Sequence, residues 1–213
     1  MRLPHSVRMG VISLAVASVV GAVFLIPASR GVAEHHEGSA AKFDSEGNLI
    51  RPTGYREWVF VGTPLTPNDL NGGLASFPEF HAVYMDPASW EHYKRTGEFR
   101  DGTVLMKELI SVGSKQATSG KGYFMGEYLG LEAAVKSKKQ FPDEPGNWAY
   151  HSFTSGGSPM VVGADAAHGG PYNAKAKAFP TAVCASCHTA SAAEDMVFTQ
   201  FYPVLRAAKA AVK

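Results

Sequence analysis

The sequence predicts an α+β fold in which a mainly antiparallel β-sheet forms the core and a few helices pack around it. Short segments rich in aromatic and β-branched residues recur along the chain, and turn-forming residues separate them. Segments with a helical start or a helical period are fewer. The composition, with 45% hydrophobic and 18% charged residues among 213, suits a single globular domain with a substantial core.

The first 33 residues have the pattern of an export signal. Arg2 and Arg8 give the positive start, residues 9–26 form an uncharged apolar run, and residues 31–33 are small, as a signal peptidase requires. We therefore expect cleavage after Ala33 and a periplasmic mature protein. A retained membrane anchor is the alternative, because a membrane span needs roughly 20 apolar residues and the run approaches that length.

The charge of the mature chain argues against a nucleic-acid partner. The full sequence has 20 basic and 19 acidic residues. Removing Arg2, Arg8 and Arg30 with the export segment leaves 17 basic residues against 19 acidic ones. No basic patch of the kind that binds nucleic acid remains.

Residues 34–52 are polar, include His35 and His36, and show no hydrophobic period, so we expect a flexible leader there. The domain proper then covers residues 53–213. Within it, the alternation of apolar runs and turn signals predicts strands at residues 55–62, 80–85, 103–112, 123–131 and 148–153.

Helices are expected at three places in this domain. The Pro-Ala-Ser start at Pro87 predicts a short helix over residues 87–96, between two strands. Residues 155–177 are rich in Gly, Ala, Pro and Ser and predict a long loop. A helix should follow the cysteine motif described next. Because Pro203 interrupts residues 190–211, a second short helix should then run to the C-terminus.

The sequence contains only two cysteines, and they form the motif Cys184-Ala-Ser-Cys187-His188. Two cysteines are too few for a disulfide scaffold in an exported chain. Their spacing is typical of covalent haem attachment, in which both thiols bond to vinyl groups and the adjacent histidine reaches the iron. A redox dithiol, half of a zinc site and a chance disulfide are alternatives, but none explains the whole set. We predict one haem c, attached through Cys184 and Cys187, with His188 as the iron ligand.

The sixth position of that iron has no obvious protein ligand. Only 25 residues follow His188, and Met196 would lie on the same side of the haem as His188. The remaining methionines in the domain lie in or beside apolar runs and suit the core; they are Met85, Met106, Met125 and Met160. We therefore expect an open position that binds small molecules.

Lys107 interrupts an apolar strand. Because side chains alternate along a strand, Lys107 shares one face with Leu105 and Leu109, and Glu108 shares the other face with Met106. Two interpretations stay open. Lys107 is either a surface residue whose stem lies along apolar neighbours, or a desolvated amine that can act as a nucleophile.

Five further stretches make the chain resemble the cytochrome P-460 family, which includes hydroxylamine-oxidising haem proteins. The resemblance covers nearly the whole mature chain and rests on these stretches together with the haem motif. They are Tyr55-Arg-Glu-Trp58, Thr96-Gly-Glu-Phe-Arg-Asp-Gly-Thr-Val104 leading to Lys107-Glu-Leu109, Gly122-Tyr-Phe-Met-Gly126, Glu144-Pro-Gly-Asn-Trp148 and Asp195-Met-Val-Phe-Thr-Gln-Phe-Tyr-Pro203.

The resemblance implies an antiparallel β fold with helices, usually dimeric, and a five-coordinate haem with a third covalent bond. That bond joins a lysine nitrogen to a porphyrin meso carbon, and by position the lysine is Lys107. Efficient members are thought to use a carboxylate shortly before the haem motif as a proton acceptor. Residues 158–183 offer only Asp165. His168 is a weaker candidate.

Three functions are consistent with these features. The first is oxidation of hydroxylamine to nitrous oxide or nitrite, with a soluble redox partner such as another cytochrome c. The second is binding of nitric oxide without turnover, as in a related branch that lacks the lysine cross-link. The third is simple electron transfer by a six-coordinate haem. Lys107 is the sequence feature that favours the first.

Overall fold

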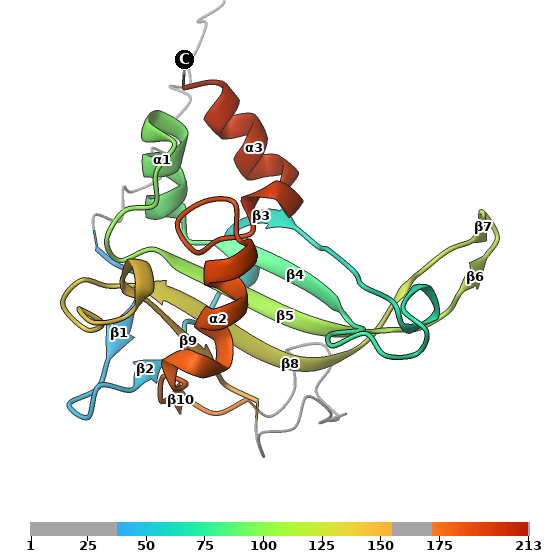
Figure 1. Cartoon of the computed structure of the whole chain (residues 1–213), viewed down its shortest axis with the longest axis horizontal. Coiled ribbons are helices and arrows are strands. Elements are labelled where there is room, and N and C mark those ends of the chain that lie inside the picture. The colour runs from blue at the N-terminus through green and yellow to red at the C-terminus, as the bar shows by residue number, and fades with distance from the viewer. Residues whose placement is uncertain (1–37, 155–171, 213) are drawn as a thin grey trace, which may run out of the picture. The chain divides into compact units, whose positions relative to one another are not determined.

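The centre of the protein is a five-stranded antiparallel sheet, seen in a computed structural model that describes residues 38–154 and 172–212 (Figure 1). The strand order is β3-β4-β5-β8-β9. The strands are β3 (Val59–Gly62), β4 (Phe80–Met85), β5 (Val104–Val112), β8 (Met125–Lys136) and β9 (Trp148–Ser152). Together with three α-helices in the described part of the chain, this sheet confirms the predicted α+β class.

Helix α1 (Pro87–Thr96) has the bounds that the sequence predicts. The Asp86 side chain accepts a hydrogen bond from the Ser89 backbone N–H at 2.9 Å, and Pro87 occupies the first helical turn, where a missing N–H does no harm. Gly97 ends the helix in the left-handed conformation, with φ at 70°.

The two faces of the sheet bury different clusters. On one face, Leu105 packs with Tyr93 from α1 and Leu205 from α3 (Pro203–Ala210). On the other face, Met106 packs with Leu49 and Phe153. The alternation predicted for residues 103–112 is therefore confirmed, and the face that carries Lys107 is the one that the helices cover.

The segment expected to be a flexible leader is partly structured. Strands β1 (Lys42–Phe43) and β2 (Leu49–Ile50) form a small antiparallel sheet with β10 (Lys175–Ala176). Leu49 is fully buried in the second cluster, so this residue anchors the otherwise largely polar stretch to the domain. The proposed export segment at residues 1–33, with His35 and His36, lies outside the described residues.

The C-terminal helices differ from the sequence expectation in one respect. Helix α2 (Thr181–Ser191) contains the cysteine motif, whereas we expected the helix to follow it. Pro180 immediately precedes α2, and the run from Thr181 to Ala190 lacks glycine and proline, so the motif itself is helical. Pro203 does begin the last helix, as predicted.

The remaining short elements connect these parts. A hairpin of β6 (Gln116–Ala117) and β7 (Gly120–Lys121) extends from the β5–β8 connection (Figure 1). The 3-10 turns in the described residues are η1 (Tyr55–Glu57), η2 (Asn68–Leu70), η3 (Pro145–Asn147) and η5 (Thr199–Phe201). None of the helices in residues 38–154 and 172–212 has the length and hydrophobicity that crossing a membrane requires.

The predicted core methionines have mixed outcomes. Met85 and Met106 are fully buried, as expected. Met125 is 50% exposed, because it starts β8 near the projecting hairpin rather than under the helices. Met160 lies outside the described residues.

Candidate functional site

Helix α2 presents the two cysteines and the histidine of the motif. Cys184 and Cys187 are three residues apart, so their thiols lie on the same side of the helix, about one turn from each other. Both thiols are free; Cys184 is half-buried and Cys187 is exposed. Ala185 is buried, and helix α2 contacts β9 and lies across the front of the sheet in Figure 1.

His188 is held in one orientation. Its Nδ1 lies 2.6 Å from the backbone carbonyl of Met196, and since a carbonyl can only accept, Nδ1 carries the proton and donates. The rings of Tyr150 and Phe198 contact the imidazole, with centroids 4.5 and 4.6 Å away. In the neutral ring Nε2 therefore keeps its lone pair, which is the arrangement that a metal-binding histidine needs.

Electrostatics favour the neutral form of this imidazole. Burial lowers the pKa of His188, and the positive charge of Lys107 lowers it further. The hydrogen bond to Met196 and the charge of Glu132 act in the opposite direction, but the pKa stays below its ordinary value. A neutral imidazole is the form that binds iron.

A strained loop supplies the carbonyl that orients His188. Asp195 and Met196 both have positive φ, at 41° and 64°, a conformation that costs about 1–3 kcal/mol for each residue that is not glycine. Lys136 fastens this loop, because its Nζ lies 3.0 Å from Asp195 Oδ2 and donates to the Gly146 carbonyl at 2.7 Å. Lys136 and Gly146, which are far away in sequence, therefore hold in place the loop at residues 195–196, called the proximal loop below.

Lys107 lies in the middle of β5, on the face that the helices cover. Its neighbours across the sheet are Val83 on β4 and Glu132 on β8. The Lys107 Nζ lies 2.6 Å from Glu132 Oε2, and the two side chains are 29% and 30% exposed. The ring of Phe77 lies 6.0 Å from the same nitrogen. Lys107 is thus neither fully solvated nor fully buried.

The structure brings Lys107 into the surroundings of the haem motif. The charges of Lys107 and Glu132 both act on the pKa of His188, and both act on the pKa of Cys184, which burial raises above its ordinary value. Cys187 adjoins Cys184 on α2. The four residues predicted from the sequence therefore share one face of the sheet, although they come from β5 and α2.

Two carboxylates on this face escaped the sequence analysis, which sought one just before the motif. Glu132 faces Lys107, and Glu79 lies 3.3 Å from His81 Nε2. Burial acts to raise the pKa of Glu79, but the bond with His81 and the charge of Lys107 outweigh it, so the net shift is downward. Asp165 and His168 lie outside the described residues.

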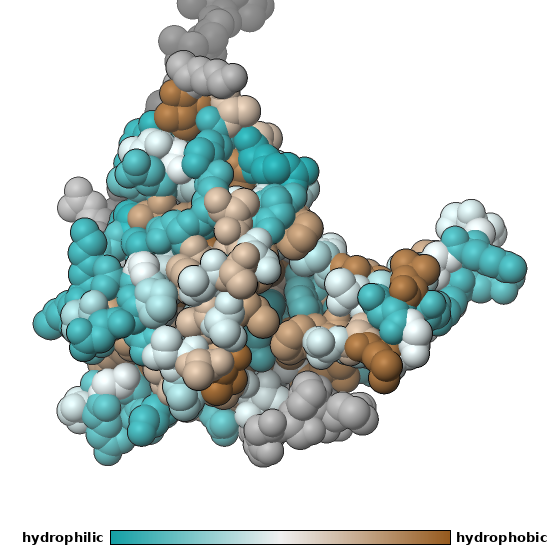
Figure 2. All heavy atoms as spheres, in the orientation of Figure 1, coloured by the Kyte–Doolittle hydropathy of each residue, from teal (hydrophilic) through white to brown (hydrophobic). Residues whose placement is uncertain are grey.

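The surroundings of His188 fit a flat, largely apolar group with polar edges. The Tyr150 hydroxyl and the Trp148 Nε1 are buried, and neither has a hydrogen-bond partner among the described residues. Phe77, Phe179 and Val183 are 56%, 36% and 59% exposed, and a contiguous apolar patch is what a bound flat group would cover. Figure 2 shows apolar surface near α2 and beside the projecting hairpin, on the face that α2 covers. A haem bound to the motif would cover such surface.

The opposite face of β5 holds a buried polar cluster. Glu108 is fully buried and accepts hydrogen bonds from the Tyr55 hydroxyl at 2.7 Å and from Arg56 Nε at 2.7 Å. Burial and the Glu108 charge raise the pKa of Tyr55 well above its ordinary range, so Tyr55 remains a donor. This cluster anchors η1 to the strand that carries Lys107.

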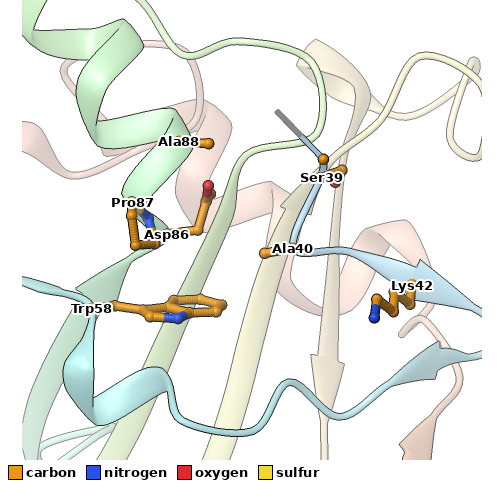
Figure 3. A pocket seen from close by; sticks show the side chains of 8 residues that line it. Ser39, Ala40, Lys42, Trp58, Asp86, Pro87 and Ala88 are labelled. Atoms are coloured by element: carbon orange, nitrogen blue, oxygen red, sulfur yellow. The ribbon is translucent and has the colours of Figure 1, made fainter. Parts of the chain in front are cut away.

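A pocket of about 370 Å³ lies elsewhere, between the start of α1 and the N-terminal part of the described chain (Figure 3). Trp58, Lys42 and Asp86 are among its lining residues, and none of the motif residues is. Both oxygens of Asp86 already accept backbone hydrogen bonds, from Ser89 and Val104. Asp86 therefore serves to hold the backbone at the start of α1 and of β5.

A family model of known proteins matches this chain. The family model described as Cytochrome P460 matches residues 52–199, which is well over half of the chain. The matched range includes β3 to α2, the motif and Lys107. No match is found among curated proteins.

Proposed function

We propose that this chain, which belongs to the cytochrome P460 family, oxidises hydroxylamine to nitrous oxide or nitrite. Membership of the family makes it a haem cytochrome. One observation carries the finer proposal: Lys107 lies on the face of β5 that also carries Leu105, and the cluster built on that face includes Tyr150, whose ring lies against His188 of the motif. A lysine in this position is available for a bond to the haem edge.

The residues that would hold the haem are all on the helix-covered face. Cys184 and Cys187 would form the two thioethers, His188 Nε2 would bind the iron, and Lys107 would form the third link. When bound there, the haem would supply a redox-active iron that can take up a small ligand such as hydroxylamine and accept its electrons.

The protein's own groups orient and protect this site. The Met196 carbonyl fixes the tautomer and direction of His188, and Tyr150 and Phe198 restrict rotation of the imidazole. Phe77 lies beside Lys107 and would keep water from that edge. Glu79 and His81, 3.3 Å apart, form a pair that can hold a proton on the same side of the sheet.

A comparison of the wild-type protein with Lys107→Arg tests this proposal. Arginine keeps the positive charge and most of the stem, but its guanidinium stays protonated and is a poor nucleophile. With hydroxylamine and an electron acceptor, wild type should form nitrous oxide or nitrite, and the variant should retain thioether-bound haem without turnover. Lys94→Arg, on the exposed face of α1, is the matched control and should behave as wild type. Normal turnover by Lys107→Arg would refute the proposal.

Nitric oxide binding without turnover is the second candidate. It is supported by the lack of any carboxylate between Tyr172 and Val183, the stretch just before the motif in which efficient oxidisers are expected to have one. In that case wild type would bind nitric oxide in the ferrous state but leave hydroxylamine unchanged. A reduced protein that fails to bind carbon monoxide would instead favour simple electron transfer.

The proposal also covers the location of the protein and its partners. The pattern of residues 1–33 supports export to the periplasm with cleavage after Ala33. We further propose a homodimer and a soluble electron acceptor such as another cytochrome c. Sedimentation of the mature protein and reduction of added cytochrome c during turnover test these two points.

A further inference from the structure

The turn between α2 and η5 has a backbone conformation that its residues only partly favour. The Val197 N–H donates to the Glu194 carbonyl at 2.7 Å and closes a turn over residues 194–197. Its two central residues, Asp195 and Met196, have φ of 41° and 64°. Turns with two left-handed central residues are built mainly from Asn, Asp and Gly, so Asp195 suits its place and the bulkier Met196 does not. Contacts from outside the turn must therefore help to hold it.

This conformation directs a hydrogen-bond acceptor at His188. In a trans peptide the C=O points away from the N–H. Because the Val197 N–H points into the turn, the Met196 carbonyl of the same peptide points out of it, toward His188 Nδ1 at 2.6 Å. The left-handed backbone at residues 195 and 196 therefore decides whether His188 keeps this bond.

Lys136 holds the side chain of Asp195. Its Nζ lies 3.0 Å from Asp195 Oδ2 and 3.1 Å from Oδ1. The same nitrogen donates to the Gly146 carbonyl at 2.7 Å and lies 5.6 Å from the centroid of the Trp148 ring. The Lys136 side chain is only 12% exposed, so water competes little for its charge. Removing one partner from a shielded pair costs more than removing one from an exposed pair.

The start of the turn is fastened separately. Glu194 Oε2 accepts a hydrogen bond from the Tyr93 hydroxyl at 3.1 Å and lies 2.9 Å from Lys209 Nζ. These contacts fix the residue before the two left-handed ones. Lys136 instead reaches the left-handed pair itself, through Asp195.

We propose that Lys136 is a positioning residue that sets the reduction potential of the haem. It acts through Asp195 on the turn, and the turn keeps the Met196 carbonyl bonded to His188 Nδ1. A hydrogen bond from the second ring nitrogen makes an imidazole a more basic metal ligand, and a more basic ligand favours ferric over ferrous iron, which lowers the potential. This inference rests on the proposed function only in placing the haem iron on His188.

The test compares the reduction potentials of the wild-type protein and of Lys136→Met/Asp195→Ala, each as the full chain with thioether-bound haem. The double variant removes both charges of one pair, so the net charge is unchanged and the shift reports on the turn. The equilibrium should move about tenfold toward ferrous iron, the lower end of the effect of losing an outer partner of a metal-binding histidine. For one electron this is a rise of about 59 mV. The iron–histidine stretching vibration of the reduced protein should also move to lower frequency.

A control and a rescue variant separate this role from a merely structural one. Lys94→Met/Glu91→Gln removes an exposed pair on α1, 2.7 Å apart, and should keep the wild-type potential. Lys136→Met/Asp195→Asn/Met196→Gly lacks the same two charges as the test variant, but it places Asn-Gly, the pair that such turns favour most, at the centre. Its potential should return to near the wild-type value.

The possible outcomes are distinct. A wild-type potential and vibration in Lys136→Met/Asp195→Ala overturns the inference, and so does an Asn-Gly variant that stays fully shifted. If the double variant yields no holoprotein, the vibration in Asp195→Ala decides in the same way. Wild-type protein that carries the haem on His188 but leaves hydroxylamine unchanged contradicts the proposed function alone. Wild-type protein without a haem iron on His188 overturns both.

Discussion

Replacing Glu108 by leucine should destabilise the haem-loaded protein by about 3 kcal/mol. The buried carboxylate accepts hydrogen bonds from the Tyr55 hydroxyl and from Arg56 Nε, each at 2.7 Å, and Arg56 Nη2 completes the ion pair 2.6 Å from the same oxygen. Tyr55 is 6% exposed, so its hydroxyl would lose its acceptor away from water, at a cost of about 1–3 kcal/mol.

Loss of the ion pair with Arg56 should lower the unfolding free energy by less than the loss of a fully buried ion pair would. Breaking a fully buried ion pair by removing one partner costs about 3–5 kcal/mol. The Arg56 side chain is 31% exposed and can turn toward water, which brings its share below that range. The burial of a leucine side chain offsets part of the remaining loss, which gives the total of about 3 kcal/mol.

Urea unfolding followed by far-ultraviolet circular dichroism measures this difference in unfolding free energy. Glu108→Gln, which keeps an acceptor for Tyr55, should lose about half as much, or roughly 1.5 kcal/mol. Glu127→Gln on the exposed part of β8 is the control and should change the free energy by less than about 0.5 kcal/mol. A Glu108→Leu variant as stable as that control would refute the reasoning.

Three further outcomes follow from the structure. Burial lowers the pKa of His151 from 6.5 to about 4. Between these two pH values the unfolded chain binds a proton that the folded protein does not. The unfolding free energy should therefore fall by roughly 3 kcal/mol as the pH is lowered from 6.5 to about 4. His151→Phe should remove that part of the pH dependence in denaturant titrations, and an unchanged slope would contradict the assignment. Lys136→Met should lower the unfolding free energy by about 1–2 kcal/mol, because it removes the contacts of Lys136 with Asp195 and with the Gly146 carbonyl. An unfolding free energy equal to that of wild type would show that these contacts do not stabilise the loop. A variant with Cys184→Ala, Cys187→Ala and Lys107→Arg should release all its haem to acidified organic solvent, and haem that stays covalent would show a link at some other residue.

The sequence predicts well those elements whose ends are set by residues within or directly beside them. Asp86, Pro87 and Gly97 mark both ends of α1, and the alternation around Lys107 gives its face. These signals act within a few residues, so a sequence carries them without knowledge of the tertiary fold.

The leader and the motif helix show where local signals fail. Residues 42–50 look polar, yet β2 forms because β10, more than a hundred residues later, pairs with it. The cysteine motif carries no strong helix-starting residue except the preceding proline, so its helical state was missed. The pairing of β2 depends on a distant strand that a local pattern does not contain, whereas the local signals for α2 were present but weak.

The carboxylates of the site were missed for a related reason. Glu132 faces Lys107 only because of the β5–β8 register, and two irregularities shift that register after Leu109. In the sequence Glu108 cannot be distinguished from an ordinary strand residue, because its partners Tyr55 and Arg56 belong to η1 and only the tertiary fold places them beside it. A signal was present for Glu108, since a charged residue on the same face as Met106 and Ile110 needs a partner.

The absorption spectrum of the purified, fully matured protein in its reduced state tests the central claim most directly. A bond from Lys107 would place a nitrogen directly on the macrocycle, a larger change to the conjugated system than the saturation of the two vinyl groups by thioether attachment. We expect wild type to absorb far from the position of an ordinary c-type haem, and Lys107→Arg to show the ordinary c-type spectrum with the haem still attached. If the two proteins give the same ordinary spectrum, Lys107 is not joined to the haem and the hydroxylamine-oxidising assignment is contradicted.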